Sequence, residues 1–192
     1  MEIDSKIDLR HVQISTGNIL LRPWILKNDL DDYFAMASNP QVANAAGFKA
    51  HDCLEQAKSY LRKTQTQKEN LAIYHKSDNR VVGYIGACNF KIVKNSNNHW
   101  VNSFEIYYAL HPSYWGQGIA VMAAKSFINF AFDNLDINII TCSHFAKNAQ
   151  SKRVIEKCGF SYSHKKLIYA PQLNKHFESL CYILNKADNP TP

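Results

Sequence analysis

Residues 108–132, YALHPSYWGQGIAVMAAKSFINFAF, contain the end of an apolar strand, a turn with two glycines and a long apolar helix. The glycines are Gly116 and Gly118. A helix that begins directly after such a turn exposes its first backbone N–H groups and carries a partial positive charge at that end. Because glycine has no Cβ atom, an anion can approach these groups closely. The pattern therefore indicates either an anion-binding turn or an ordinary tight connection.

Three kinds of phosphate-binding turn place glycines between a strand and a helix. The mononucleotide loop G-x-x-x-x-G-K-[ST] is absent from the sequence. The dinucleotide pattern G-x-G-x-x-G fails at its last position, which is Val121, and it accompanies a parallel sheet that the hairpins described below contradict. The third is the acyl-coenzyme A loop, [Q/R]-x-x-G-x-[G/A]. Residues 115–120, WGQGIA, match its two small-residue positions.

The segments around this turn alternate between strand and helix. Residues 103–110 predict a strand with one face made of Phe104, Ile106, Tyr108 and Leu110 and the other of Glu105, Tyr107 and Ala109. The apolar residues after Gly118 predict a helix buried against the sheet. Residues 137–145 predict a strand parallel to the first, because the helix between them makes a right-handed crossover. Residues 148–159 predict a short helix capped by Asn148.

The rest of the chain predicts a largely antiparallel sheet. We expect a strand at 18–24, a helix capped by Asn28, a helix at 52–66 with Leu54, Ala57 and Leu61 buried, a hairpin within 71–90, a polar loop at 91–100, and a last hairpin made by 160–169 and 176–185. The order β-α-α-β-β-β-α-β-α-β-β predicts a single domain of the α/β class, α+β type. Its mixed, mostly antiparallel sheet should have central parallel strands and helices on both faces. The expected divisions are an N-terminal extension at 1–17, the domain at 18–184 and a tail at 185–192.

Composition supports one globular domain. With 192 residues, 46% of them hydrophobic, the chain can bury a sizeable core. No segment resembles a signal peptide or a membrane-spanning helix, so we expect a cytoplasmic protein that does not enter a membrane. The five cysteines stand far apart without metal-ligand spacing, so neither disulfides nor a metal site is expected.

A net charge of +6 suits an anionic partner, either nucleic acid or a phosphate-rich cofactor. A basic nucleic-acid-binding module predicts aromatic residues interleaved with basic ones on an open sheet face. The segment EIYYAL at 105–110 has two tyrosines but no neighbouring basic residue. Nucleic acid is therefore the less favoured partner.

At this point the sequence resembles a known family, the GNAT N-acetyltransferases, and within it the RimJ/RimL branch of ribosomal-protein N-terminal acetyltransferases. Two segments carry the resemblance: EIYYALHPSYWGQGIAVMAAK at 105–125, and NAQSKRVIEKCGF at 148–160, which matches the branch pattern N-x-x-S-x-x-[VLI]-x-x-K-x-G-F. The likeness extends over about 18–184. One departure is Trp115, where the broad family has Gln or Arg.

The resemblance implies that acetyl-coenzyme A binds in a V-shaped gap where the parallel strands separate. The pantetheine arm would pair with the backbone of Tyr108, Ala109 and Leu110, and Asn148 and Ser151 would touch it from the facing helix. The pyrophosphate would lie on the backbone N–H groups of the glycine turn, which are those of Gly116, Gln117, Gly118, Ile119, Ala120 and Val121.

The reaction that the resemblance implies requires a neutral amine. An α-amino group, with a pKa of about 8, is neutral far more often at pH 7 than a lysine, with a pKa of about 10.4, so a protein N-terminus is the easier acceptor. Glu105 is our candidate general base, and Ser151 our candidate proton donor to the leaving thiolate. Two further departures stand at Ser143, where some relatives have Glu, and at Ile155, where many have Tyr.

Several alternatives remain open. Cys142 lies two residues from His144, which permits a cysteine nucleophile, but no third orienting residue is identifiable. The acceptor could instead be a small amine such as a polyamine or an aminoglycoside. We expect the two early helices and the hairpin loop at 170–175 to select it. The sequence leaves open whether the protein is a monomer or a homodimer.

Overall fold

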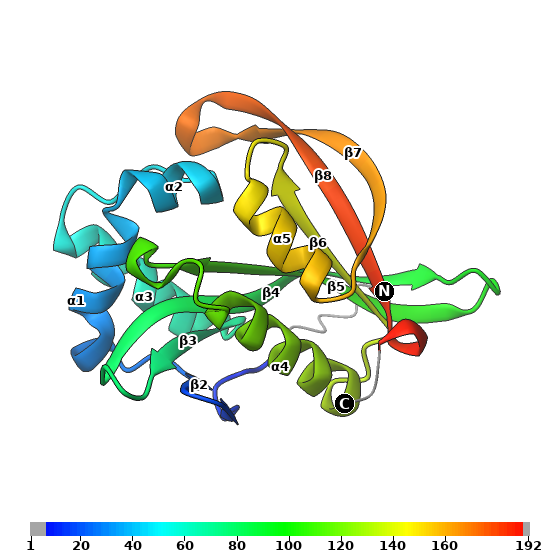
Figure 1. Cartoon of the computed structure of the whole chain (residues 1–192), viewed down its shortest axis with the longest axis horizontal. Helices are drawn as coiled ribbons and strands as arrows, with labels where there is room; N and C mark the ends of the chain where they lie inside the picture. Colours follow the sequence, from blue (N-terminus) through cyan, green and yellow to red (C-terminus); the bar gives the residue numbers. More distant parts are fainter. Residues whose placement is uncertain (1–6, 190–192) are drawn as a thin grey trace.

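The computed structural model describes residues 7–189 as one eight-stranded sheet with five α-helices (Figure 1). The strands are β1 (Ile14–Thr16), β2 (Ile19–Arg22), β3 (Asn70–His75), β4 (Arg80–Lys94), β5 (Trp100–Leu110), β6 (Ile139–Phe145), β7 (Ser161–Ala170) and β8 (Lys175–Asn185). The helices are α1 (Leu26–Ala37), α2 (Pro40–Ala46), α3 (Leu54–Gln67), α4 (Ile119–Asn134) and α5 (Ala149–Lys157).

The strand order is β1-β2-β3-β4-β5-β6-β8-β7. All neighbours are antiparallel except β5 and β6, which are parallel and joined through α4. This arrangement confirms the predicted fold class. No helix within residues 7–189 has the length and apolar character needed to cross a membrane.

Helices cover both faces of the sheet, as predicted. On one face, α4 contributes Phe127 and Phe132 to a core that includes Phe104 of β5. On the other face, α1, α2 and α3 pack around Tyr33, which contacts the rings of Trp24 and Tyr60. The alternation of β5 side chains between these two cores agrees with the prediction for 103–110.

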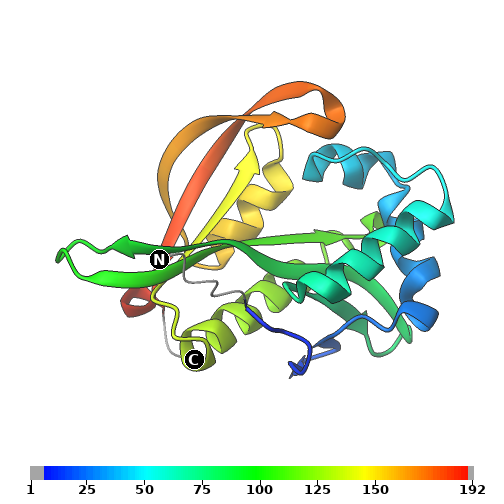
Figure 2. The same cartoon turned by 180° about the vertical axis from the view of Figure 1, so that it is seen from behind.

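The central parallel pair is short, and this opens a gap in the sheet. Pairing between β5 and β6 extends only from Ser103 with Ile139 to Ile106 with Cys142. Beyond these pairs β6 turns away together with β8, which stays paired to it as far as Phe145 (Figure 2). The edge of β5 from Tyr107 to Leu110 therefore has a neighbour, β4, on one side alone.

The early helical region differs from the prediction. Helix α2 was not expected, and α1 begins at Leu26, so Asn28 is not its cap. The cap position is Ile25, which has no side-chain cap. The carboxylate of Asp29 accepts a hydrogen bond from the N–H of Ile25 (2.7 Å) while paired with Arg22 (2.8 Å).

Two other predictions were wrong. Leu54 is 40% exposed at the start of α3, although Ala57 and Leu61 are buried as expected. Half of the predicted polar loop at 91–100 is strand, because β4 extends to Lys94 and β5 begins at Trp100, so that the two form a long hairpin.

The ends of the chain relate to the predicted divisions as follows. Part of the segment assigned to an N-terminal extension is built into the fold, since β1 joins the sheet and Leu9 is buried in the core. Residues 1–6 of that segment, and residues 190–192 of the predicted tail, lie outside the described residues.

Candidate active site

The backbone of β5 presents hydrogen-bonding groups to the gap at alternate residues. Even-numbered residues face β6: Asn102 O accepts from the N–H of Asn138 (3.0 Å), and Leu110 O accepts from Trp115 Nε1 (3.0 Å). The next odd-numbered residue, His111, donates its N–H to Val82 O of β4 (2.8 Å). By this alternation Tyr108 turns both its peptide groups toward the gap, and Leu110 turns its N–H there.

Tyr108, Ala109 and Leu110 therefore differ in the backbone groups that they can offer to a pantetheine arm. Ala109 lies opposite Tyr84 in the ladder, and the alternation directs its peptide groups toward β4. Leu110 has its carbonyl engaged by Trp115. An extended ligand strand can thus reach Tyr108 and the N–H of Leu110, while Ala109 contributes to the wall of the gap.

The glycine turn is open toward the gap. Gly116 and Gly118 have left-handed φ angles of 77° and 79°, which other residues adopt at a cost, and nothing lies within 4 Å of a Cβ built at either position. The N–H groups of Ile119, Ala120 and Val121 begin α4 and have no hydrogen-bond partner within residues 7–189. The side chain of Gln117 donates to Ser113 O (2.8 Å), which leaves its backbone for a ligand.

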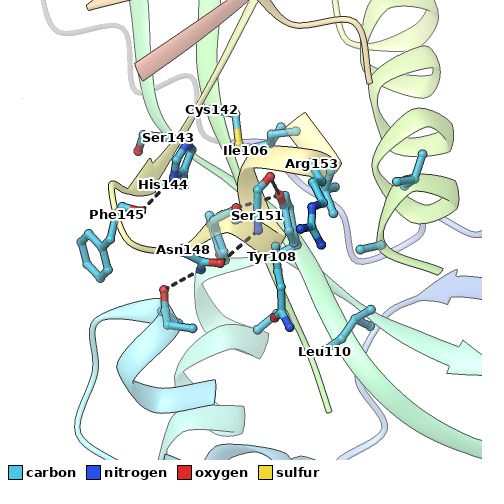
Figure 3. Close-up of a pocket in the computed structure, with 18 of the residues that line it drawn as sticks. Ile106, Tyr108, Leu110, Cys142, Ser143, His144, Phe145, Asn148, Ser151 and Arg153 are labelled. Carbon is cyan, nitrogen blue, oxygen red and sulfur yellow. Dashed lines mark hydrogen bonds between the residues drawn. The ribbon is translucent and has the colours of Figure 1, made fainter. Parts of the chain in front are cut away.

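Helix α5 forms the facing wall (Figure 3). Asn148 caps it, as predicted, by accepting from the N–H of Ser151 (3.0 Å), and it donates to Ala45 O at the end of α2 (3.3 Å). The Ser151 hydroxyl is 2.9 Å from the hydroxyl of Tyr108. Burial is the main cause that raises the pKa of Tyr108, and the nearby Cys142 thiol raises it further, so this phenol stays protonated.

Glu105 lies on the opposite face of the sheet, at the point where β5 and β6 separate. Its carboxylate accepts hydrogen bonds from Ser143 Oγ (2.6 Å) and from Asn89 Nδ2 (2.9 Å). Since Tyr108 points to the α5 side and Glu105 to the α2 side, the gap brings together groups from both faces of the sheet.

These groups line one cleft of about 720 Å³. All the predicted site residues line it except Gln117, whose side chain folds back on the turn. The cleft is also lined by Asn89, Trp115, Arg153 and Lys157, which were not among the predicted site residues. Arg153 and Lys157 are four residues apart on α5. This spacing places both cations on the same face of the helix, which the sequence alone indicates.

The geometry does not favour the cysteine alternative. Cys142 is buried, and its pKa is raised by that burial and by the charge of Glu105, which keeps it a thiol. His144 is engaged elsewhere: its Nδ1 lies 2.8 Å from Phe145 O and its Nε2 lies 3.3 Å from the hydroxyl of Tyr182. Ile155, the position of the missing tyrosine, is buried in the core.

The pattern of the acetyltransferase (GNAT) domain matches residues 18–161, more than half of the chain. The chain belongs to the GNAT family of acetyltransferases. This GNAT protein is 25% identical to the uncharacterized N-acetyltransferase YoaA of Bacillus subtilis (strain 168) over 152 residues, 77% of this chain and 81% of the relative.

Solved GNAT structures share the fold. An acetyltransferase from Bacillus anthracis has a TM-score of 0.77 at 19% identity, covering 92% of this chain and 99% of that one. A ribosomal-protein-S5-alanine acetyltransferase from Vibrio fischeri has 0.64 at 15%, covering 93% and 100%. A spermidine N-acetyltransferase from Vibrio cholerae, in complex with CoA and spermine, has 0.72 at 12%, covering 90% and 98%. At these identities the likeness shows the fold alone.

The GNAT family uses acetyl-coenzyme A, and the cleft fits that molecule chemically. The unpaired N–H groups at the start of α4 and the open space before both glycines suit a pyrophosphate. Arg153 and Lys157 add positive charge to the same cleft. In the part of the chain from 7 to 189, no three histidine, cysteine or acidic side chains are grouped to hold a metal ion.

Proposed function

We propose that this GNAT enzyme transfers the acetyl group of acetyl-coenzyme A to the α-amine of a protein N-terminus, by direct attack in a ternary complex. One observation carries the proposal: the gap between β5 and β6 joins a face with the helix-start N–H groups and Ser151 to a face with Glu105. Donor and acceptor can therefore approach from opposite sides and meet at the gap. Holding them together accounts for much of the acceleration.

The residues of the gap have distinct roles in the proposed reaction. The neutral amine attacks the thioester carbonyl carbon, a C–N bond forms, and the nitrogen gives one proton to Glu105, directly or through water. A backbone N–H of Tyr108 or Leu110 stabilises the negative oxygen. When the C–S bond breaks, the thiolate takes a proton from the Ser151 hydroxyl. Glu105 then releases its proton to solvent, and Ser151 takes a proton back from solvent.

The charges of the cleft favour an acceptor with a single amine. Glu105 is the one carboxylate among the cleft-lining residues of the described chain, whereas Arg153 and Lys157 are cations. A polyamine or an aminoglycoside carries several ammonium groups, and each needs a partner when it leaves water. A protein α-amine needs only one, and with a pKa of about 8 it loses its proton easily.

The relatives include enzymes for both kinds of acceptor. The Vibrio fischeri structure is a ribosomal-protein acetyltransferase, and the Vibrio cholerae one acts on spermidine. The resemblance of residues 148–160 to the RimJ/RimL pattern supports the protein acceptor. We accordingly place the enzyme near that branch, as part of the same proposal.

Mass spectrometry with an acceptor panel tests the proposal. The purified enzyme would be incubated with acetyl-coenzyme A and hexapeptides that differ in their first residue, alongside spermidine, spermine and kanamycin. We expect an acetyl adduct on the α-amine of some peptides and none on the polyamines or the aminoglycoside. Acetylation of the small amines alone would overturn the choice of acceptor, and no acetylation anywhere would overturn the activity.

A further inference from the structure

The carboxylate of Glu105 is held from two sides by uncharged donors. Ser143 donates its hydroxyl to Oε1 (2.6 Å), and Asn89 donates its amide to Oε2 (2.9 Å). The first donor comes from β6 and the second from β4, the strands on either side of β5. Glu105 is therefore fixed across the full width of the central three strands.

Asn89 reaches this position through an irregularity in β4. The register between β4 and β5 shifts between Cys88 and Lys91, and Asn89 has a left-handed φ of 55°. Such bulges redirect a side chain and are frequent beside active sites. Asparagine tolerates the left-handed conformation better than most residues. The bulge thus turns the amide of Asn89 toward Glu105, although a regular strand would place it on the other face.

Ser143 reaches Glu105 because of the gap. The last β5–β6 pair is Ile106 with Cys142, and Ser143 is the next residue along β6, opposite Cys181 of β8. Its hydroxyl leans back across the vertex of the V to Glu105. One donor therefore depends on the bulge and the other on the divergence of the strands.

Among residues 7–189, no cation is paired with this carboxylate. None of the ion pairs formed between residues 7 and 189 includes Glu105. Hydrogen bonds from neutral groups stabilise a negative charge without cancelling it, and each carboxylate oxygen keeps a second acceptor position. The carboxylate thus remains able to receive an amine or a water molecule from the cleft.

We propose that Asn89 and Ser143 are positioning residues, which hold Glu105 at the vertex of the gap in the orientation that accepts the proton of the acceptor amine. This inference rests on the proposed function. In the proposed reaction Glu105 takes the proton, and these two residues contact Glu105. Because each acts through Glu105, removing either should slow the chemical step and leave binding of acetyl-coenzyme A unchanged.

Three variants and one control test the inference, with acetyl-coenzyme A and the peptide of the panel above that gives the highest kcat/KM. Ser143→Ala and Asn89→Gly each remove one donor, and glycine keeps the left-handed backbone at position 89 without strain. Ser143→Thr keeps the hydroxyl and suits a strand. The control is Ser103→Ala: this residue lies on β5, as Glu105 does, but its hydroxyl donates to Lys91 O and it is not part of the cleft.

We expect kcat to fall about tenfold in Ser143→Ala and in Asn89→Gly, with KM for acetyl-coenzyme A unchanged. Ser143→Thr should recover most of the rate, and Ser103→Ala should keep all of it. Unfolding midpoints measured in parallel would show that each variant is folded. Unchanged kcat in both donor variants, or an equal loss in Ser103→Ala, would overturn the inference while the acetyltransferase activity stands. A wild-type enzyme that acetylates no peptide would instead overturn the proposed function, and the inference with it.

Discussion

The hydroxyl of Tyr108 illustrates how single groups are coupled in this site. It lies 2.9 Å from Ser151 Oγ and 3.3 Å from Ser151 O, and burial keeps its pKa raised. Either hydroxyl can donate in this pair. We infer that the phenol, which stays protonated, donates and that the Ser151 oxygen accepts from it. The hydrogen of Ser151 is then directed elsewhere, and we propose that it points to the leaving sulfur.

Replacing Tyr108 tests this coupling. In Tyr108→Phe we expect kcat to fall about three- to tenfold, because one hydrogen bond that orients Ser151 is lost. KM for acetyl-coenzyme A should change little, since the backbone of β5 is retained. Steady-state kinetics of the two single variants and of Tyr108→Phe/Ser151→Ala would measure the effect. If Tyr108 acts through Ser151, the double variant is no slower than Ser151→Ala alone, whereas additive losses would contradict the coupling.

For single residues, the sequence predicts the face of a strand on which a side chain lies better than it predicts the hydrogen-bond partners of that side chain. Alternation along residues 103–110 correctly separated Glu105 from Tyr108, since a strand has a period of two. The asparagine cap of α5 was also predictable, because capping depends on local sequence. The contacts of Glu105 were not, because Asn89 reaches it through a bulge and Ser143 through the divergence of two strands.

At the scale of the elements, Gly118 before α4 can be compared with Gly159 after α5 to separate the effect of backbone conformation from that of ligand binding. Gly118 has φ of 79° with open space in front of it, and it lines the cleft. Gly159, after α5, has φ of 86° and equally open space, but it does not line the cleft. Both positions therefore require a left-handed backbone, but only Gly118 borders the cleft.

Alanine at each glycine separates the two effects. Both Gly118→Ala and Gly159→Ala should lose about 1–2 kcal/mol of unfolding free energy, the cost of a left-handed conformation for a residue with a Cβ atom. In Gly118→Ala the new methyl group also enters the space before the helix-start N–H groups. We expect its affinity for coenzyme A to fall about tenfold or more, while Gly159→Ala binds as the wild type does.

Thermal unfolding with increasing coenzyme A measures both quantities, because a ligand that binds the folded state raises the midpoint by mass action. Equal coenzyme A stabilisation in the two variants would show that the turn does not hold the diphosphate.

The helices and strands differed in how well the sequence predicted them. Helix α4 was predictable because its apolar residues extend over several turns. Helix α2, with seven residues, is too short to show a period, although Asn39 and Pro40 form a standard helix start and Gly47 a standard end. The lengths of β4 and β5 were underestimated, because polar residues in an exposed hairpin resemble a loop.

At the level of the whole molecule, the order and directions of the central strands followed from the sequence. The crossover rule made β5 and β6 parallel, and the hairpin signals made most other neighbours antiparallel. Contacts between distant segments could not be derived in this way. Asn148 reaches Ala45 of α2, and the N–H of Lys49 donates to Gln172 of the β7–β8 turn, so these contacts join segments about 100 residues apart or more.

The molecule also buries many groups that ionise at alkaline pH. Burial is the largest cause in each case: it raises the pKa of Tyr60 and of Cys88 to about 12, and that of Cys158 to about 11. The pKa values of Tyr33 and Tyr84 are also raised. In the unfolded chain such thiols and phenols ionise near pH 9 and pH 10. Above those values the unfolded state therefore binds fewer protons than the folded state.

Stability should consequently fall as pH rises above about 9. The contribution of the raised pKa values is complete below pH 9 and is lost as pH rises from about 9 to 12, at up to about 1.4 kcal/mol per pH unit for each proton of difference. Urea unfolding at intervals from pH 7 to 11 would measure this slope. Tyr60→Phe removes one of these groups, so its stability should decline less steeply than that of the wild type above pH 10. A midpoint that stays constant to pH 11 would contradict the burial of ionisable groups on both faces of the sheet.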